Sequence, residues 1–247
     1  MRKILKFIAP KSFNDGAKKC NQLGKKLIKT GKVDNFLDIG CGDGKLSLEF
    51  AKFLNAKSIY GIEIVDELIE INKKNGINCI KGDLNNVWSL KSNFFDIILS
   101  SQNIEHLHNT RKYLEECYRC LKPGGQLIIL TENLSSTINI FALLFGWQPF
   151  STTNINGWSL GNPLIWHIGE KRNNIFLEKY QKTSISGTVG HVRVLAFRGL
   201  HDLLERVGFK DIRIYSKGYL PFWGYLSDLL CKIDKMHGHF LVASCFK

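Results

Sequence analysis

The sequence has no internal repeat, no low-complexity tract and no cysteine framework. Its seven cysteines are an odd number scattered over 247 residues, so we expect reduced thiols in a cytoplasmic protein rather than disulfides. The first residues, MRKILKFIAPKSF, contain only short apolar runs broken by Lys6, Pro10 and Lys11, which is not typical of a signal peptide. With 44% apolar and 23% charged residues, the composition is that of a globular chain and excludes wholesale disorder.

Charge is also missing from one long segment. Residues 133–169 contain no Asp, Glu, Lys or Arg, yet Gly, Pro and Asn interrupt them too often for a membrane-spanning helix. The segment carries the aromatic residues Trp147, Phe150, Trp158 and Trp166. Two interpretations stay open, a lid that closes over a bound ligand and excludes water, and a plain hydrophobic subdomain.

Positive charge is present in excess but is unevenly distributed. The chain has a net charge of +12, of which residues 1–34 supply +8, residues 35–170 supply −3 and residues 171–217 supply +6. Basic flanks around a near-neutral middle favour contact with an anionic partner. Lysines that merely solvate helices are the alternative, because residues 16–30 have a helical apolar stripe with lysines opposite it.

From residue 35 onwards, apolar runs alternate with amphipathic segments. The predicted strands are 35–39, 58–63, 77–83, 94–100, 126–132, 211–216 and 239–246. The predicted helices are 45–54, 66–76, 110–125, 138–147, 196–208 and 226–234. Such alternation predicts an α/β domain whose parallel sheet is covered on both faces.

The turn after the first predicted strand contains Gly40, Gly42 and Gly44, which allow a ligand to approach bare backbone. A dinucleotide fingerprint would require glycine at the position of Lys45. Asp38 would also repel a pyrophosphate, whereas its carboxylate suits a ligand that carries an ammonium group and a sulfonium. The loop therefore favours a cationic ligand without phosphate.

Two further acids end the second and third predicted strands. Glu63 lies where an acid can accept hydrogen bonds from both ribose hydroxyls, and Asp83 lies where an acid can accept from an adenine amine. Together with Asp38 they describe S-adenosylmethionine. Ordinary capping of strand ends is the alternative interpretation of all three acids.

Five segments of the sequence resemble the motifs of a known family. They are FLDIGCGDG (36–44), GIE (61–63), KGDL (81–84), FDIILSSQNIEHL (95–107) and LKPGG (121–125). In their order and spacing the chain resembles the class I S-adenosylmethionine-dependent methyltransferases, in the broad small-molecule branch with the LKPGG signature. The resemblance implies a Rossmann-like sheet of seven strands in the order 3-2-1-4-5-7-6, with the last strand antiparallel and an insertion between strands 5 and 6. The donor-binding residues that it implies are Asp38, Gly40, Cys41, Gly42, Gly44, Glu63, Ile64, Asp83, Leu84, Ser100 and Ser101.

We divide the chain into four parts on this basis. They are a basic N-terminal helical segment (1–34), the S-adenosylmethionine-binding α/β core (35–132), an aromatic acceptor-site insertion or lid (133–195) and a C-terminal completion of the core sheet (196–247). The insertion is expected to determine which acceptor is methylated.

Methyl transfer is an in-line displacement, so the protein mainly holds the reactants in line. A hydroxyl acceptor also needs a base, for which His106 and His191 are the candidates; ordering of the loop and orientation of the substrate are their alternative roles. For His167, and for Cys117 and Cys120 as a C-x-x-C pair, packing is the favoured role, and no metal is expected. Asn/Asp-Pro-Pro-aromatic and Pro-Cys motifs are absent, which argues against adenine-N6, glutamine and cytosine-C5 methylation.

The leading hypothesis is a small-molecule O-methyltransferase that acts on a sugar, a glycan precursor or a lipid-linked acceptor. Its basic N-terminal segment would allow peripheral contact with an anionic membrane surface. An RNA methyltransferase that uses the basic flanks and a non-catalytic S-adenosylmethionine-binding protein are the alternatives. Against RNA stand the uncharged insertion and the absence of a recognisable RNA-binding module.

Overall fold

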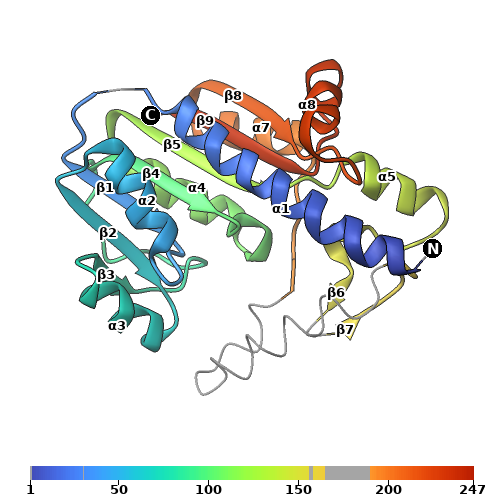
Figure 1. The fold of residues 1–247 in the computed structure, drawn as a ribbon. Coiled ribbons are helices and arrows are strands. Elements are labelled where there is room, and N and C mark those ends of the chain that lie inside the picture. Colours follow the sequence, from blue (N-terminus) through green and yellow to red (C-terminus); the bar gives the residue numbers. More distant parts are fainter. Residues whose placement is uncertain (1, 30, 156–157, 165–189) are drawn as a thin grey trace.

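A computed structural model describes residues 2–29, 31–155, 158–164 and 190–247 (Figure 1). The strands are β1 (Asn35–Ile39), β2 (Ser58–Glu63), β3 (Asn78–Lys81), β4 (Phe95–Ser101), β5 (Leu121–Glu132), β6 (Asn154–Ile155), β7 (Trp158–Ser159), β8 (Lys210–Lys217) and β9 (Phe240–Phe246). The α-helices are α1 (Arg2–Leu27), α2 (Lys45–Leu54), α3 (Asp66–Lys74), α4 (Thr110–Cys120), α5 (Thr137–Leu144), α7 (Phe197–Val207) and α8 (Gly224–Ile233). Two short 3-10 helices are η1 (Ile104–His106) and η2 (Phe150–Thr152).

The main sheet has seven strands in the order β3-β2-β1-β4-β5-β9-β8. Strands β1 to β5 pair in parallel, and β9 is antiparallel to both of its neighbours. The two-residue strands β6 and β7 form a separate hairpin, so β8 and β9 are the sixth and seventh strands of the main sheet. The predicted strand order, with its antiparallel last strand, is confirmed.

Helices cover both faces of the sheet, and successive side chains of a strand point to opposite faces, so each central strand contributes to two cores. On β5, Leu127 and Ile129 join a core with α4 and α7, whereas Ile128 and Leu130 join a second core with α1 and α2. Figure 1 shows α1 lying across its face of the sheet, where it contacts β5, β8 and β9. The continuous apolar runs of the central strands follow from this two-sided burial.

Two predicted boundaries differ most from the structure, whereas the others differ by at most three residues. Helix α4 ends at Cys120, and the following residues 121–125 begin β5 with a shift of register between the pairs Phe95↔Leu121 and Ile97↔Gln126. Pro123 has no N–H to continue a helix, and Gly124 adopts a φ of 76°, so the chain turns into the sheet earlier than predicted. Helix α1 begins well before residue 16 because its packing on the sheet stabilises more helix than propensity alone would.

Among the described residues, no helix is both long enough and apolar enough to span a bilayer.

Candidate active site

The glycine loop joins β1 to α2 at the carboxyl edge of the sheet. The backbone N–H groups of Gly40 and Cys41 donate to the carbonyl of Ile62 on β2, at 2.8 and 3.2 Å. Gly40, Gly42 and Gly44 have φ values of 64°, 55° and 78°, which L side chains rarely adopt. The loop therefore needs its glycines, and it lies where ligands of open α/β sheets bind.

Two asparagine side chains that the sequence analysis missed hold the loop in place. The Asn103 Nδ2 donates to the carbonyl of Ile39 at 2.5 Å. The Asn72 Nδ2 donates to the carbonyl of Gly42 at 2.7 Å. A Cβ on Gly40 would lie 2.1 Å from the Asn103 Oδ1, and one on Gly44 would lie 2.4 Å from the Asn72 Oδ1. No sequence signal identifies these amides, because Asn103 precedes η1 and Asn72 lies on α3, both outside the loop.

Glu63 connects the loop to the end of β2. Its Oε2 accepts from the Gly42 N–H at 2.9 Å, and its Oε1 accepts from the N–H groups of Ile64 and Val65 at 2.8 and 3.1 Å. The carboxylate is buried and faces the glycine loop. It lies at the place where the resemblance puts the ribose hydroxyls.

Asp83 lies beyond the end of β3 and is exposed. Its Oδ1 accepts from the Asn85 N–H at 2.9 Å, and its Oδ2 accepts from the Asn86 Nδ2 at 3.1 Å. Asp83 thus caps its own turn, which is the alternative role that the sequence left open. The neighbouring Leu84 is half-buried against the core.

The remaining predicted donor residues lie along the same edge. Cys41 is buried, with its Sγ 3.7 Å from the Cys79 Sγ. Ser100 is buried at the end of β4, where its hydroxyl is hydrogen-bonded to the Tyr113 hydroxyl, and Ser101 is half-buried beside it. The structure therefore brings β1, β2 and β4 residues together around the loop.

Asp38 lies at the centre of this edge. It is buried, and its Oδ2 accepts from the Ser47 Oγ at 2.5 Å. Burial raises the pKa of Asp38 to about 7, and the charge of Glu63 acts in the same direction. The carboxyl group therefore becomes the carboxylate that a cationic ligand needs as the pH passes through neutrality.

This shifted pKa predicts a dependence of stability on pH. The native carboxyl group keeps its proton up to a pH of about 7, whereas the unfolded chain releases it near the ordinary value of 3.8. Stability therefore falls as the pH rises between these values. Asp38→Asn should remove this dependence, so its melting temperature relative to the wild type should be higher at pH 8 than at pH 5. An equal difference at both pH values would contradict the assignment.

The loop after β4 brings the two candidate bases together. The backbone carbonyl of Glu105 accepts from the N–H groups of Val192 and Arg193, at 2.8 and 3.0 Å. His191 is thereby held beside His106, with the two ring centroids 4.8 Å apart. The pairing joins η1 to the last residues of the insertion, and the wide separation of the two histidines in the sequence gave no sign of it.

Each of these histidines has a defined tautomer. The His106 Nδ1 lies 3.1 Å from the carbonyl of Gly190, and the His191 Nδ1 lies 2.5 Å from the carbonyl of Ser151. Because a carbonyl only accepts, each Nδ1 carries a hydrogen, so the neutral form of each ring has its lone pair at Nε2. Burial, together with the charge of His191, lowers the pKa of His106 to about 4. Both rings can therefore accept a proton at Nε2.

The ligand atoms of Glu105, His106 and His191 also lie within 4.8 Å of one another. That spacing would allow a metal ion, but a buried acid beside two half-buried histidines equally forms a proton-transfer site. The two roles predict different responses of the activity to a chelator.

The described part of the insertion presents apolar side chains to solvent. Leu144 and Phe145, at the end of α5, are 78% and 58% exposed. Phe145 stacks on Trp147 with ring centroids 5.1 Å apart, and Phe141 packs on both rings. The predicted positions Trp166 and His167 lie outside the described residues.

Cys117 and Cys120 are fully buried in the core between α4 and the sheet. Burial raises the pKa of both thiols, so they remain protonated and pack as small apolar side chains.

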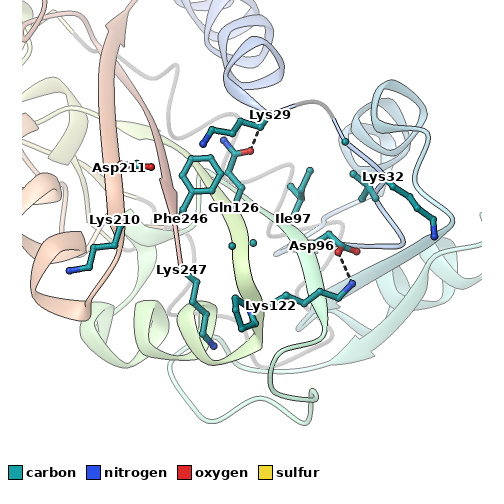
Figure 2. Close-up of a pocket in the computed structure, with 15 residues that line it drawn as sticks. Lys29, Lys32, Asp96, Ile97, Lys122, Gln126, Lys210, Asp211, Phe246 and Lys247 are labelled. Atoms are coloured by element: carbon teal, nitrogen blue, oxygen red, sulfur yellow. Dashed lines mark hydrogen bonds and ion pairs between the residues drawn. The ribbon is translucent and has the colours of Figure 1, made fainter.

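A hollow of about 490 Å³ lies at the opposite, amino-terminal edge of the sheet (Figure 2). Among its lining residues are the lysines Lys29, Lys32, Lys122, Lys210 and Lys247. Lys122 pairs with Asp96 at 2.5 Å, and Lys29 lies over the Phe246 ring at 4.0 Å. The hollow is therefore basic, and it is separated by the length of the strands from the glycine loop.

Comparison with known proteins agrees with this geometry. Residues 37–129 match the family model described as methyltransferase domain. A mitochondrial ubiquinone biosynthesis O-methyltransferase of Rattus norvegicus is 29% identical over 121 residues, which are 45% of this chain and 34% of that protein. An uncharacterized methyltransferase of Schizosaccharomyces pombe is 31% identical over 129 residues, which are 47% of this chain and 46% of that protein. The chain thus matches less than half the length of these curated relatives.

Solved structures show the same fold over nearly the whole chain. An S-adenosylmethionine-dependent methyltransferase from Archaeoglobus fulgidus is 18% identical, with a TM-score of 0.58, and the match covers 98% of this chain and 99% of that one. Residues 37–129 therefore match the methyltransferase-domain family, and the fold of the chain is that of S-adenosylmethionine-dependent methyltransferases. S-adenosylmethionine is the methyl donor of this class.

Proposed function

We propose that the protein transfers a methyl group from S-adenosylmethionine to an oxygen of a small-molecule acceptor. The observation that carries the proposal is the pair His106 and His191, whose Nδ1 atoms donate to backbone carbonyls and leave Nε2 available, together with a glycine loop of the donor-binding type. The O-methyltransferase name of the rat relative supports oxygen as the acceptor atom.

The chain's own residues have distinct tasks in this reaction. The sulfonium of the donor supplies an activated methyl group. Asp38 offers negative charge to the cationic part of the donor, and Glu63 accepts hydrogen bonds at the end of β2. His191 takes the proton of the acceptor hydroxyl at Nε2, while His106 packs against its ring. Alignment of the reactants accounts for most of the rate, because the transfer is an in-line displacement.

A sugar, a glycan precursor or a lipid-linked molecule is the acceptor class we favour. Exposed aromatic and aliphatic side chains on α5 suit stacking on a sugar ring or contact with an apolar chain. The basic residues of α1 would permit peripheral contact with an anionic membrane. The four-part division of the chain, with residues 133–195 as the acceptor-site insertion, is part of this proposal.

The basic hollow gives little support to an RNA acceptor. It lies at the amino-terminal edge of the sheet, whereas a nucleotide to be methylated must reach the carboxyl edge beside Ser100 and His106. A non-catalytic role in S-adenosylmethionine binding differs from our proposal in one measurable respect. Only an enzyme forms S-adenosylhomocysteine in the presence of acceptor.

The test combines calorimetric titration with S-adenosylmethionine and a methyl-transfer assay on sugars, lipid-linked glycans, phenols and RNA. We expect donor binding and transfer to at least one hydroxyl acceptor. Binding without transfer to any acceptor would favour the non-catalytic role, and salt-dependent transfer to RNA would replace our proposal.

Glu63→Gln tests the donor site separately. The amide of Gln has no charge, and its NH₂ group cannot accept hydrogen bonds from the backbone. A hydrogen bond to a charged group contributes about 1.5–3 kcal/mol. We therefore expect the dissociation constant of S-adenosylmethionine to rise by roughly 10- to 100-fold. Glu70→Gln, which changes an exposed carboxylate paired with Lys73 on α3, is the matched control. Equal affinities of the two variants would exclude Glu63 from the donor site.

A further inference from the structure

Glu132, at the end of β5, lies between His191, the proposed base, and His239, which has no role in the proposed reaction. Its Oε2 is 3.6 Å from the His191 Nδ1 and 3.8 Å from the His239 Nε2. Glu132 and His239 are both buried, at 7% and 4% exposure, so water screens their interaction with His191 only weakly.

This cluster also gathers buried polar atoms that have no hydrogen-bond partner among the described residues. They are the Glu105 Oε1, the Glu132 Oε2 and the His239 Nδ1. Buried polar atoms in native proteins are nearly always paired, and exceptions mark strained or functional places. The two carboxylate oxygens can only accept while ionised, so the cluster is organised to receive a proton or a positive charge.

We propose that Glu132 acts through His191, because its negative charge stabilises the imidazolium formed when His191 accepts the proton of the acceptor hydroxyl. The inference rests on the proposed function and deepens it. In the step, the acceptor oxygen loses its proton to the His191 Nε2 and forms a bond to the methyl carbon. The bond between this carbon and sulfur breaks, its electron pair stays on sulfur, and His191 afterwards releases the proton to solvent.

The orientation of the His191 ring does not depend on Glu132. The ring is held by the carbonyl of Ser151, and Ser151 is itself held by Asn139. The Asn139 Nδ2 donates to the Ser151 Oγ at 2.9 Å and to the carbonyl of Asn133 at 2.9 Å, and its Oδ1 accepts from the Ser151 N–H at 3.2 Å. Charge and orientation therefore come from different residues, so a neutral replacement of Glu132 isolates the charge.

Other titratable groups also face His191. Glu105 and His106 belong to η1, and His239 belongs to β9. Burial raises the pKa of Glu105 to about 7, and its Oε2 accepts from the Thr131 Oγ1 at 2.9 Å, so Glu105 is partly protonated at neutral pH. Burial lowers the pKa of His239, so this ring stays neutral and adds no competing charge. Glu132 is the group on β5 that faces His191.

Glu132→Gln tests the proposal. We expect kcat to fall about 10- to 100-fold with little change in the KM of the acceptor or in donor affinity. The acid limb of the pH–rate profile should move to lower pH, because an amide no longer favours the protonated His191. Glu132→Asp should recover part of the rate. Glu116→Gln, which changes a buried carboxylate paired with Arg119 on α4, is the control and should leave the acid limb in place.

A titration of the His191 ring by NMR in the wild type and in Glu132→Gln supplies a readout without turnover. We expect its midpoint to move to lower pH in the variant. An unmoved midpoint in an active enzyme would overturn the inference alone. A wild type that transfers no methyl group to any acceptor would overturn the proposed function and the inference with it. Activity that EDTA abolishes and a divalent cation restores would make His191 a ligand, and it would also overturn the inference.

Discussion

Gly40→Ala is expected to lower the melting temperature and to remove measurable binding of S-adenosylmethionine. The new Cβ would lie 2.1 Å from the Asn103 Oδ1 and 2.8 Å from its Cγ. To make room, Asn103 must give up its hydrogen bond to the carbonyl of Ile39. The φ of 64° at Gly40 adds strain of about 1–2 kcal/mol for any L residue. Both effects displace the loop that the donor must contact.

Gly76→Ala is the matched control for this substitution. Gly76 has a φ of 80°, and no atom of the described residues lies within 4 Å of the position of a Cβ, so it reports backbone strain without a steric conflict. We expect Gly40→Ala to destabilise the protein by about 1–3 kcal/mol more than the control, as for a steric conflict in a packed site. Asn103→Ala should reduce the extra cost of Gly40→Ala. Equal losses for Gly40→Ala and Gly76→Ala in thermal unfolding would show that the contact is unimportant.

His191→Gln is expected to reduce kcat by about 100- to 10,000-fold, which is the usual contribution of a general base. Donor affinity should stay within about twofold of the wild type, because the contacts of His191 belong to Ser151 and His106 rather than to the glycine loop. Steady-state kinetics and calorimetric titration measure the two quantities separately. If the rate falls only as far as donor affinity falls, His191 has a structural role and is not the base.

Two further histidine substitutions are needed to interpret the result for His191→Gln. His201→Gln changes a half-exposed histidine on α7 (43% side-chain exposure) and should leave the rate unchanged. His106→Gln separates the two roles that the sequence left open for His106. A role in ordering the loop predicts a loss of stability together with activity, because its Nδ1 donates to the carbonyl of Gly190. A role as base predicts a loss of kcat alone.

The proposed acceptor-site insertion also contributes to the surroundings of His191. Asn139 on α5 and Ser151 in η2 both lie within it, and together they place the carbonyl that orients His191. Exposed apolar residues of the same segment face solvent. If this segment also contacts the acceptor, as we propose, acceptor binding would be coupled to the orientation of His191.

The sequence by itself determined the first strands and the first core helix, which surround the glycine loop. Strand β1, helix α2 and strand β2 begin and end at the predicted residues, because a buried parallel strand is a short apolar run and a glycine turn ends it. Glu63 could be placed beside the glycine loop for the same reason, since parallel strands meet at one edge of the sheet. The strand order came from resemblance rather than from these local patterns.

Tertiary structure alone decided which side chains surround His191 and which side chains hold the glycine loop in place. His106 and His191 meet although 84 residues separate them in the chain, and Glu132 reaches His239 only because β9 pairs with β5. Asn72 and Asn103 hold the glycine loop from two other elements. Local sequence patterns record which segments are buried, but they do not record which side chains of distant segments meet. Such meetings depend on the packing of helices, loops and antiparallel strands around the finished sheet.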